Sequence, residues 1–93
     1  MRVVWTRRAS ERLNEIFALV AADSFDRASE FCDGLIEATS QLASHPFSGP
    51  VLPEDAAYRQ LVVDGYRIVY AVTDESVYVA TIVAPGMTYK HAI

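Results

Sequence analysis

The chain has 93 residues, of which 52% are hydrophobic and 22% are charged, a composition typical of a single folded domain. Its formal net charge of −4 argues against a general nucleic-acid binder, and we expect no sequence-specific contact with nucleic acid. The sequence has no apolar run long enough to cross a membrane, and one cysteine, Cys32, allows no internal disulfide. We therefore expect one cytoplasmic domain that spans residues 1–93.

The first half of the chain predicts one strand and two helices. Residues 3–5 form a short apolar run typical of a strand, and the Thr6 hydroxyl can accept a backbone N–H at the start of a helix. Apolar residues then recur at helical spacing over residues 7–22. They recur again beyond two capping residues, 23–24, until the Ser-His-Pro sequence at 44–46. These two amphipathic segments predict a helical hairpin.

The second half of the chain predicts three strands. After a proline-containing loop that runs to about Ala57, the apolar period changes to two over residues 58–63, 66–72 and 77–83. The Asp64-Gly65 pair is a strong signal for a tight hairpin turn. The order β-α-α-β-β-β predicts an α+β domain in which a helical hairpin packs on one face of a small, mostly antiparallel sheet.

The hairpin turn predicts which side chains share a face of the sheet. We expect the helices to cover the face formed by Leu61, Val63, Tyr66, Ile68, Tyr70, Val72, Val77, Val79, Thr81 and Val83. The opposite side, called the second face below, then carries Tyr58, Gln60, Val62, Arg67, Val69, Ala71, Tyr78, Ala80 and Ile82. The second face is largely apolar although the helices cover only one side, so we expect another cover for it.

Arg67 stands in the middle of the second face and has two interpretations. Its guanidinium could bind a phosphate or carboxylate, or its stem could pack while its head reaches water. A second group of arginines, at positions 2, 7, 8 and 12, is either a target-binding patch or a solvated helix face. Two histidines and one cysteine without ligand spacing predict no metal site, and we expect no cofactor. Cys32 is expected to be a small buried hydrophobe.

Several stretches together resemble the RelE/ParE toxin superfamily of bacterial type II toxin–antitoxin systems. They are "VVWTRRASERLNEI", "LASHPFSGP", "YRQLVVDGYRIVYAV" and "VYVATIV", and they cover the chain from about Val3 to Val83. The resemblance implies the same β-α-α-β-β-β fold, a toxin that arrests growth, and a cognate antitoxin that wraps it in a hetero-oligomer. It also implies an occupant for the second face.

The resemblance implies different chemistry in its two branches. In the ribosome-dependent endonuclease branch, basic residues together with a tyrosine or histidine cleave mRNA. Arg67 matches the strand arginine of that set, and Arg59 lies near another of its basic positions. The basic pair expected after the last strand is absent, although Tyr89 or His91 could substitute. The ParE branch inhibits DNA gyrase without nuclease chemistry. Because the catalytic set of the endonuclease branch is incomplete in this sequence, we favour the ParE branch and expect a protein that is not an enzyme.

Three functions follow as hypotheses: a ParE-like gyrase inhibitor, a RelE-type endonuclease, and a binding module without toxicity. For the first, we expect the antitoxin to lie across the second face or along the helical hairpin. The antitoxin-binding residues predicted on the second face are Arg67, Val69, Ala71, Tyr78, Ala80 and Ile82.

Overall fold

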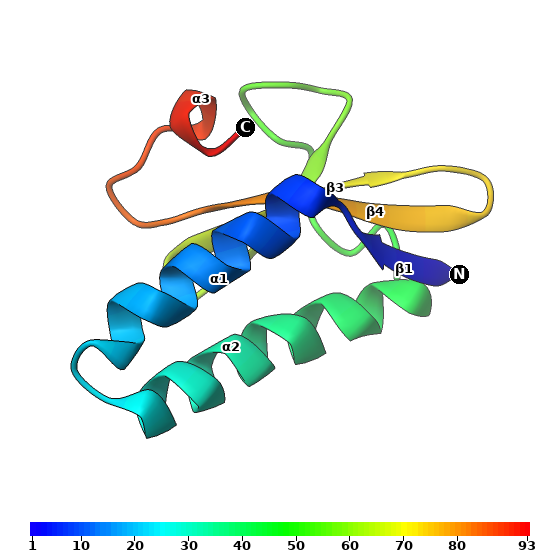
Figure 1. The fold of residues 1–93 in the computed structure, drawn as a ribbon. Coiled ribbons are helices and arrows are strands. Elements are labelled where there is room, and N and C mark those ends of the chain that lie inside the picture. The colour runs from blue at the N-terminus through cyan, green and yellow to red at the C-terminus, as the bar shows by residue number, and fades with distance from the viewer.

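The computed structural model describes all 93 residues and places a helical hairpin on one face of a four-stranded sheet (Figure 1). The elements in chain order are β1 (Arg2–Trp5), α1 (Arg7–Ala21), α2 (Phe25–Ser40), the 3-10 turn η1 (Gln41–Ala43), β2 (Arg59–Val63), β3 (Tyr66–Val72), β4 (Ser76–Val83) and α3 (Tyr89–Ala92). The predicted β-α-α-β-β-β order is confirmed, and the short helix α3 is an addition to it. None of the helices combines the length and hydrophobicity that a bilayer crossing needs.

The sheet has the strand order β1-β4-β3-β2, so β1 and β2 are its edges. β1 runs parallel to β4, while the β2–β3 and β3–β4 pairs are antiparallel. The tight turn between β2 and β3 is confirmed, because Asp64 and Gly65 both have positive φ, 51° and 82°. Val63 and Tyr66 lie directly opposite each other beside this turn, which fixes the register of the hairpin.

The two helices begin at the predicted capping residues. The Thr6 hydroxyl accepts a hydrogen bond from the Ala9 N–H, and the Ser24 hydroxyl accepts one from the Arg27 N–H. Between the hairpin and the sheet lies a cluster of fully buried side chains: Ala9, Ile16, Leu35, Ile68, Val79 and Ile82. Trp5 packs against this cluster, and Cys32 is buried on α2, as predicted.

A β-bulge in β4 corrects part of the predicted face assignment. Tyr70 pairs with Val79 but Val69 pairs with Thr81, so Ala80 is an extra residue in β4. One extra residue reverses the alternation of every side chain beyond it. The placement of Ile82 on the second face is therefore wrong, because Ile82 is fully buried in the core beneath the helices.

The same bulge places two other residues on the second face. Thr81 and Val83 were expected beneath the helices, and both lie on the second face instead. There Val83 packs against Val69 in a separate buried cluster, while the Thr81 hydroxyl donates a hydrogen bond to the carbonyl of Ala92.

The chain itself covers much of the second face. Leu52 from the loop before β2, and Ala92 from α3, are fully buried in the cluster that contains Val69 and Val83. The segment after β4 thus lies on the side of the sheet opposite to the helical hairpin (Figure 1). The segment forms a short helix docked on the sheet, because its apolar side chains complete this second core.

Candidate functional site

Arg67 on the second face is held in an ion pair by the chain itself. Its Nη1 and Nη2 donate to Oε1 and Oε2 of Glu54, at 2.9 and 2.8 Å, and Nη1 also donates to the side-chain oxygen of Gln60 at 3.2 Å. The hydrogen bond from Arg67 lowers the pKa of Glu54, and the same bond raises the pKa of Arg67. Because both terminal nitrogens of the guanidinium bind one carboxylate, the positive charge of Arg67 is neutralised at the place where a phosphate would have to bind.

Tyr89 lies near this ion pair, in acidic surroundings. Burial raises the pKa of the Tyr89 phenol, and the negative charges of Asp55 and Glu54 raise it further. The phenol therefore stays protonated at neutral pH, and the two carboxylates beside it disfavour a second anion. The arrangement is a poor environment for a scissile phosphate.

The structure does not bring the four predicted catalytic candidates together. Arg59 lies opposite Tyr70 on the helix-facing side of β2, where its Nη1 donates to the Gly49 carbonyl at 2.8 Å. The His91 side chain is exposed, and its Nδ1 lies 3.1 Å from the Thr88 hydroxyl. Only Arg67 and Tyr89 share the second face.

The residues predicted to bind the antitoxin differ in accessibility. Val69 and Ile82 are fully buried, so neither is accessible to a partner in this conformation. Tyr78 is 37% exposed, the Arg67 side chain is 24% exposed, and Ala71 and Ala80 are half-buried. The second face therefore offers a partner a smaller open surface than the sequence predicts. The role of these residues in antitoxin binding stays a prediction.

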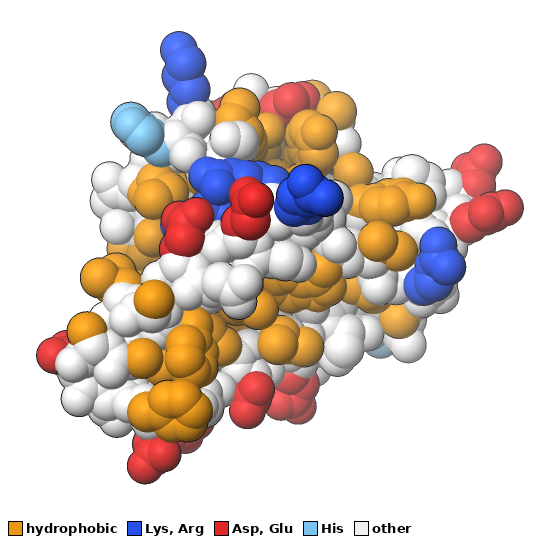
Figure 2. All heavy atoms as spheres, in the orientation of Figure 1, with side chains coloured by type: hydrophobic (Ala, Val, Ile, Leu, Met, Phe, Trp, Pro, Cys, Tyr) orange, Lys and Arg blue, Asp and Glu red, His pale blue; other side chains and the backbone are white.

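The helical hairpin also exposes large apolar side chains. Leu19, Phe25 and Ile36 are 74%, 67% and 44% exposed, and Phe25 contacts the edge of Phe17 with ring centroids 5.5 Å apart. Figure 2 shows hydrophobic side chains gathered over the end of the hairpin where α1 joins α2. A groove of about 300 Å³ runs between the two helices, lined by Leu13, Asn14, Phe17, Ser29, Cys32, Asp33 and Ile36. Such a surface is typical of a protein contact site.

Acidic side chains lie on α2 beside this apolar surface. Asp26, Glu30, Asp33 and Glu37 are all exposed, and their spacing of four, three and four residues places them along one stripe of the helix. None of them forms an ion pair within the chain. The hairpin thus combines apolar side chains with unpaired negative charge.

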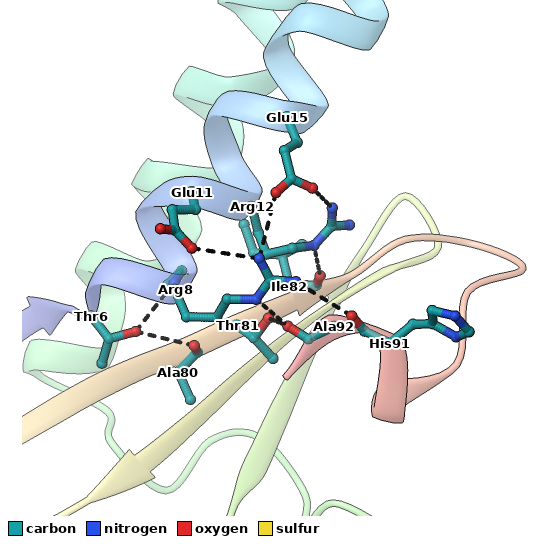
Figure 3. A network of polar contacts seen from close by, with 11 residues as sticks. Thr6, Arg8, Glu11, Arg12, Glu15, Ala80, Thr81, Ile82, His91 and Ala92 are labelled. Atoms are coloured by element: carbon teal, nitrogen blue, oxygen red, sulfur yellow. Dashed lines mark hydrogen bonds and ion pairs between the residues drawn. The ribbon is translucent and has the colours of Figure 1, made fainter.

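Two arginines of α1 hold the segment after β4 (Figure 3). Arg8 donates from Nε to the Ala92 carbonyl at 2.9 Å and from Nη2 to the His91 carbonyl at 3.3 Å. Arg12 donates from Nε to the Ile82 carbonyl at 3.0 Å and pairs with Glu15 at 2.6 Å. We call Arg8 and Arg12 the arginine clamp, because they join α1 to the last strand and to α3.

The arginine clamp is the structural feature that the sequence interpretation missed. Arg12 is only 4% exposed, so it belongs neither to a target-binding patch nor to a solvated helix face. A signal was present, because Arg12 follows Ala9 by three residues and precedes Ile16 by four, which places it on the buried stripe of α1. Arg7, by contrast, is exposed.

No group of three or more histidine, cysteine, aspartate or glutamate side chains is arranged to hold a metal ion. The acidic residues noted above lie along α2, pair with arginines or, for Asp55, stand in the loop before β2.

Comparisons with known proteins agree with this architecture. The family model for the ParE toxin of the type II toxin–antitoxin system parDE matches residues 3–88. A solved structure described as the chromosomal ParDE toxin–antitoxin system from P. aeruginosa superposes with a TM-score of 0.80 at 19% identity, covering 91% of this chain and 96% of that chain. No curated protein matches the sequence.

Proposed function

The chain belongs to the ParE toxin family of type II toxin–antitoxin systems, and from this premise we propose that it inhibits DNA gyrase and is neutralised by a cognate antitoxin. The observation that carries the proposal is the ion pair between Arg67 and Glu54. In a nuclease, a strand arginine must be free to stabilise charge on the scissile phosphate. Here that arginine is already paired with Glu54, and the nearby Tyr89 has a second carboxylate, Asp55, beside it.

Toxicity then depends on protein surfaces, since a gyrase inhibitor of this kind needs no reacting group of its own. The arginine clamp supports such a surface, because it fixes α3 and the end of β4 against α1. Partially exposed side chains held on an ordered segment bind with a smaller loss of conformational entropy than a mobile tail does.

The antitoxin surface that we propose lies along the helical hairpin. Leu19, Phe25 and Ile36 are exposed there, whereas much of the second face is covered by the chain. An amphipathic helix lying along the groove between α1 and α2 would cover Phe25 and Ile36, and its basic residues would face the acidic stripe of α2.

A gyrase supercoiling assay with the purified chain tests the main proposal. We expect supercoiling to fall as the chain is added, and to recover when the protein product of the adjacent open reading frame is present. Supercoiling that continues unchanged at a large molar excess of folded chain would refute gyrase inhibition. Growth arrest on induction, relieved by the neighbouring gene, would then still support a toxin with another target.

A ribosome-dependent endonuclease is the second candidate, and one observation favours it: Arg67 and Tyr89 lie on the same face of the sheet. This candidate predicts transcripts cleaved in a translating extract and left intact by Arg67→Ala. Uncleaved transcripts with the wild-type chain would eliminate it. If the chain neither inhibits gyrase nor cleaves transcripts but forms a tight complex with the antitoxin, the third hypothesis, a binding module without toxicity, would be favoured.

A further inference from the structure

A cleft separates α2 from the β2–β3 turn. Its volume is about 410 Å³, and its lining residues come from α1, α2, the adjoining ends of β2 and β3 and the turn between these strands. The rings of Phe31 and Tyr66 close it on the core side, with centroids 4.8 Å apart. We call it the α2–turn cleft. It is distinct from the groove between α1 and α2, with which it shares no lining residue.

Gly34 keeps this cleft open. It lies in the middle of α2, where glycine is less favourable than alanine because it exposes the backbone and loses more entropy on folding. The fold does not require a glycine here, since a Cβ added at Gly34 would meet no atom within 4 Å. Its φ is also not in the left-handed region that favours glycine. A side chain at this position would project into the cleft.

The walls and rim of the cleft define the chemistry of its occupant. The walls are apolar or aromatic, from Val20, Phe31, Val63 and Tyr66. The rim carries two carboxylates, Glu30 and Asp64, and one guanidinium, Arg27, and none of the three forms an ion pair within the chain. The rim therefore carries a net negative charge, and none of its charged groups is paired within the chain. A ligand with an apolar group and a neighbouring positive charge would complement both the walls and the rim.

The α2–turn cleft is also continuous with the exposed end of the hairpin. A smaller hollow shares Val20 and Arg27 with it and extends to Leu19 and Asp23. Leu19 is 74% exposed. A bound segment could thus leave the cleft and cover Leu19 without crossing a barrier of packed side chains.

We propose that the α2–turn cleft receives one large apolar side chain of the antitoxin, which lies next to an antitoxin lysine or arginine that pairs with Glu30 and Asp64. The inference rests on the proposed function, because it assigns an anchor point to the same partner. An anchor that fills a preformed cavity is the kind of contact that dominates binding energy at interfaces. Gly34, which has no side chain, leaves the α2 side of the cleft unobstructed.

Gly34→Trp tests the cleft without disturbing the core. The probe is the protein product of the adjacent open reading frame, titrated into the full chain by calorimetry. We expect Gly34→Trp to weaken binding at least tenfold, while Ser10→Trp, at an exposed position of α1, changes Kd less than twofold. Gly34→Ala should raise the Tm by about 4 °C, because it removes the helix penalty of glycine. That gain would show that the site tolerates side chains in the free protein.

A charge test is independent of the shape test. The double variant Glu30→Gln, Asp64→Asn should weaken binding several-fold at low ionic strength and lose this effect at high salt. Asparagine retains the tolerance of a positive φ that position 64 needs.

The outcomes separate the inference from the function it rests on. Gly34→Trp that binds with an unchanged Kd overturns the cleft assignment and leaves the antitoxin partnership intact. A wild-type chain that forms no complex overturns the partnership and the cleft assignment with it. Self-association of the wild-type chain that Gly34→Trp abolishes, seen by sedimentation, assigns the cleft to a second copy and overturns the antitoxin as occupant.

Discussion

The two faces of the sheet are covered by different parts of the chain, and the two covers differ in construction. On one face, α1 and α2 bury a continuous cluster that includes Ile16, Leu35 and Ile68. On the other, a loop residue and the short segment with α3 bury four side chains, and polar contacts from Arg8 and Thr81 hold the segment. The first cover is a packed layer, whereas the second combines one loop residue, Leu52, with the short segment of residues 84–93, called the strap below.

This difference has consequences for stability and for binding. Segments with few buried apolar contacts open locally at a lower free energy than the elements of the main core. The helix-covered face should therefore remain closed until the domain unfolds, while the segment on the second face should open while the rest stays folded. The substitutions that follow test this contrast, beginning with the largest expected effect.

Ile68→Ala should give the largest effect. Ile68 is fully buried beneath the helices, so its truncation removes apolar contacts and leaves a cavity, at a cost of about 2–5 kcal/mol in the free energy of unfolding. Urea denaturation measures the change. Val62→Ala, at a neighbouring position 62% exposed, should cost no more than about 0.5 kcal/mol. Equal losses at both positions would contradict the burial assigned to the helix-covered face.

Arg12→Met should give an intermediate effect. Methionine keeps much of the aliphatic volume but leaves the Ile82 carbonyl without its side-chain donor, and it removes the pair with Glu15. We expect a loss of about 1–3 kcal/mol in the free energy of unfolding. Arg7→Met, at an exposed position, is the matched control and should be close to neutral. A stability equal to or above wild type would mean that desolvation of the guanidinium offsets its hydrogen bonds.

Arg8→Ala should affect the strap more than the domain. Arg8 is half-buried and bonds only carbonyls of α3, apart from exposed contacts with Glu11 and Glu15. We expect amide hydrogen exchange in residues 89–93 to accelerate at least fivefold, with a global change of about 1 kcal/mol or less. Exchange within β3 should stay unchanged, as should all exchange rates in Arg7→Ala. Uniform acceleration throughout the chain would show that the two covers open together.

The helix-covered face could be predicted from sequence, because its signals are local. Apolar spacing, the capping hydroxyls of Thr6 and Ser24, and the Asp64-Gly65 turn each act over a few residues. The order of these signals, together with the family resemblance, sufficed for the correct fold.

The second face could not be predicted in the same way, because its structure depends on contacts between distant residues. The bulge at Ala80 has no glycine or proline to mark it, yet it reverses the faces of Thr81 and Ile82. The partner of Arg67 is Glu54, 13 residues earlier in a loop, and nothing in the local pattern indicates this pair. The sequence interpretation therefore assigned the wrong accessibility to Val69 and Ile82, while the role of the second face in binding stays a prediction.

The pair between Arg67 and Glu54 gives the smallest predicted effect, a pH dependence of the second-face cover. Because the folded state lowers the pKa of Glu54, the pair contributes stability above the ordinary glutamate value of 4.5. This contribution is lost as the pH falls through the lowered pKa of the folded state, since the protonated carboxyl no longer attracts Arg67. Glu54→Gln removes the titrating group and should flatten this part of the pH profile.

The measurement is Tm from about pH 6 to about pH 3 for the wild-type chain and Glu54→Gln. We expect the two curves to converge at the acidic end, where Glu54 is protonated in both states, and to differ by only a few degrees near pH 6, because the pair is partly exposed and screened. Glu37→Gln, an exposed and unpaired position, should follow the wild-type curve. Curves that stay parallel over the whole range would show that Arg67 does not hold Glu54 in solution. The arginine would then be free on the second face, and the endonuclease hypothesis would regain the phosphate-binding group that the ion pair now occupies.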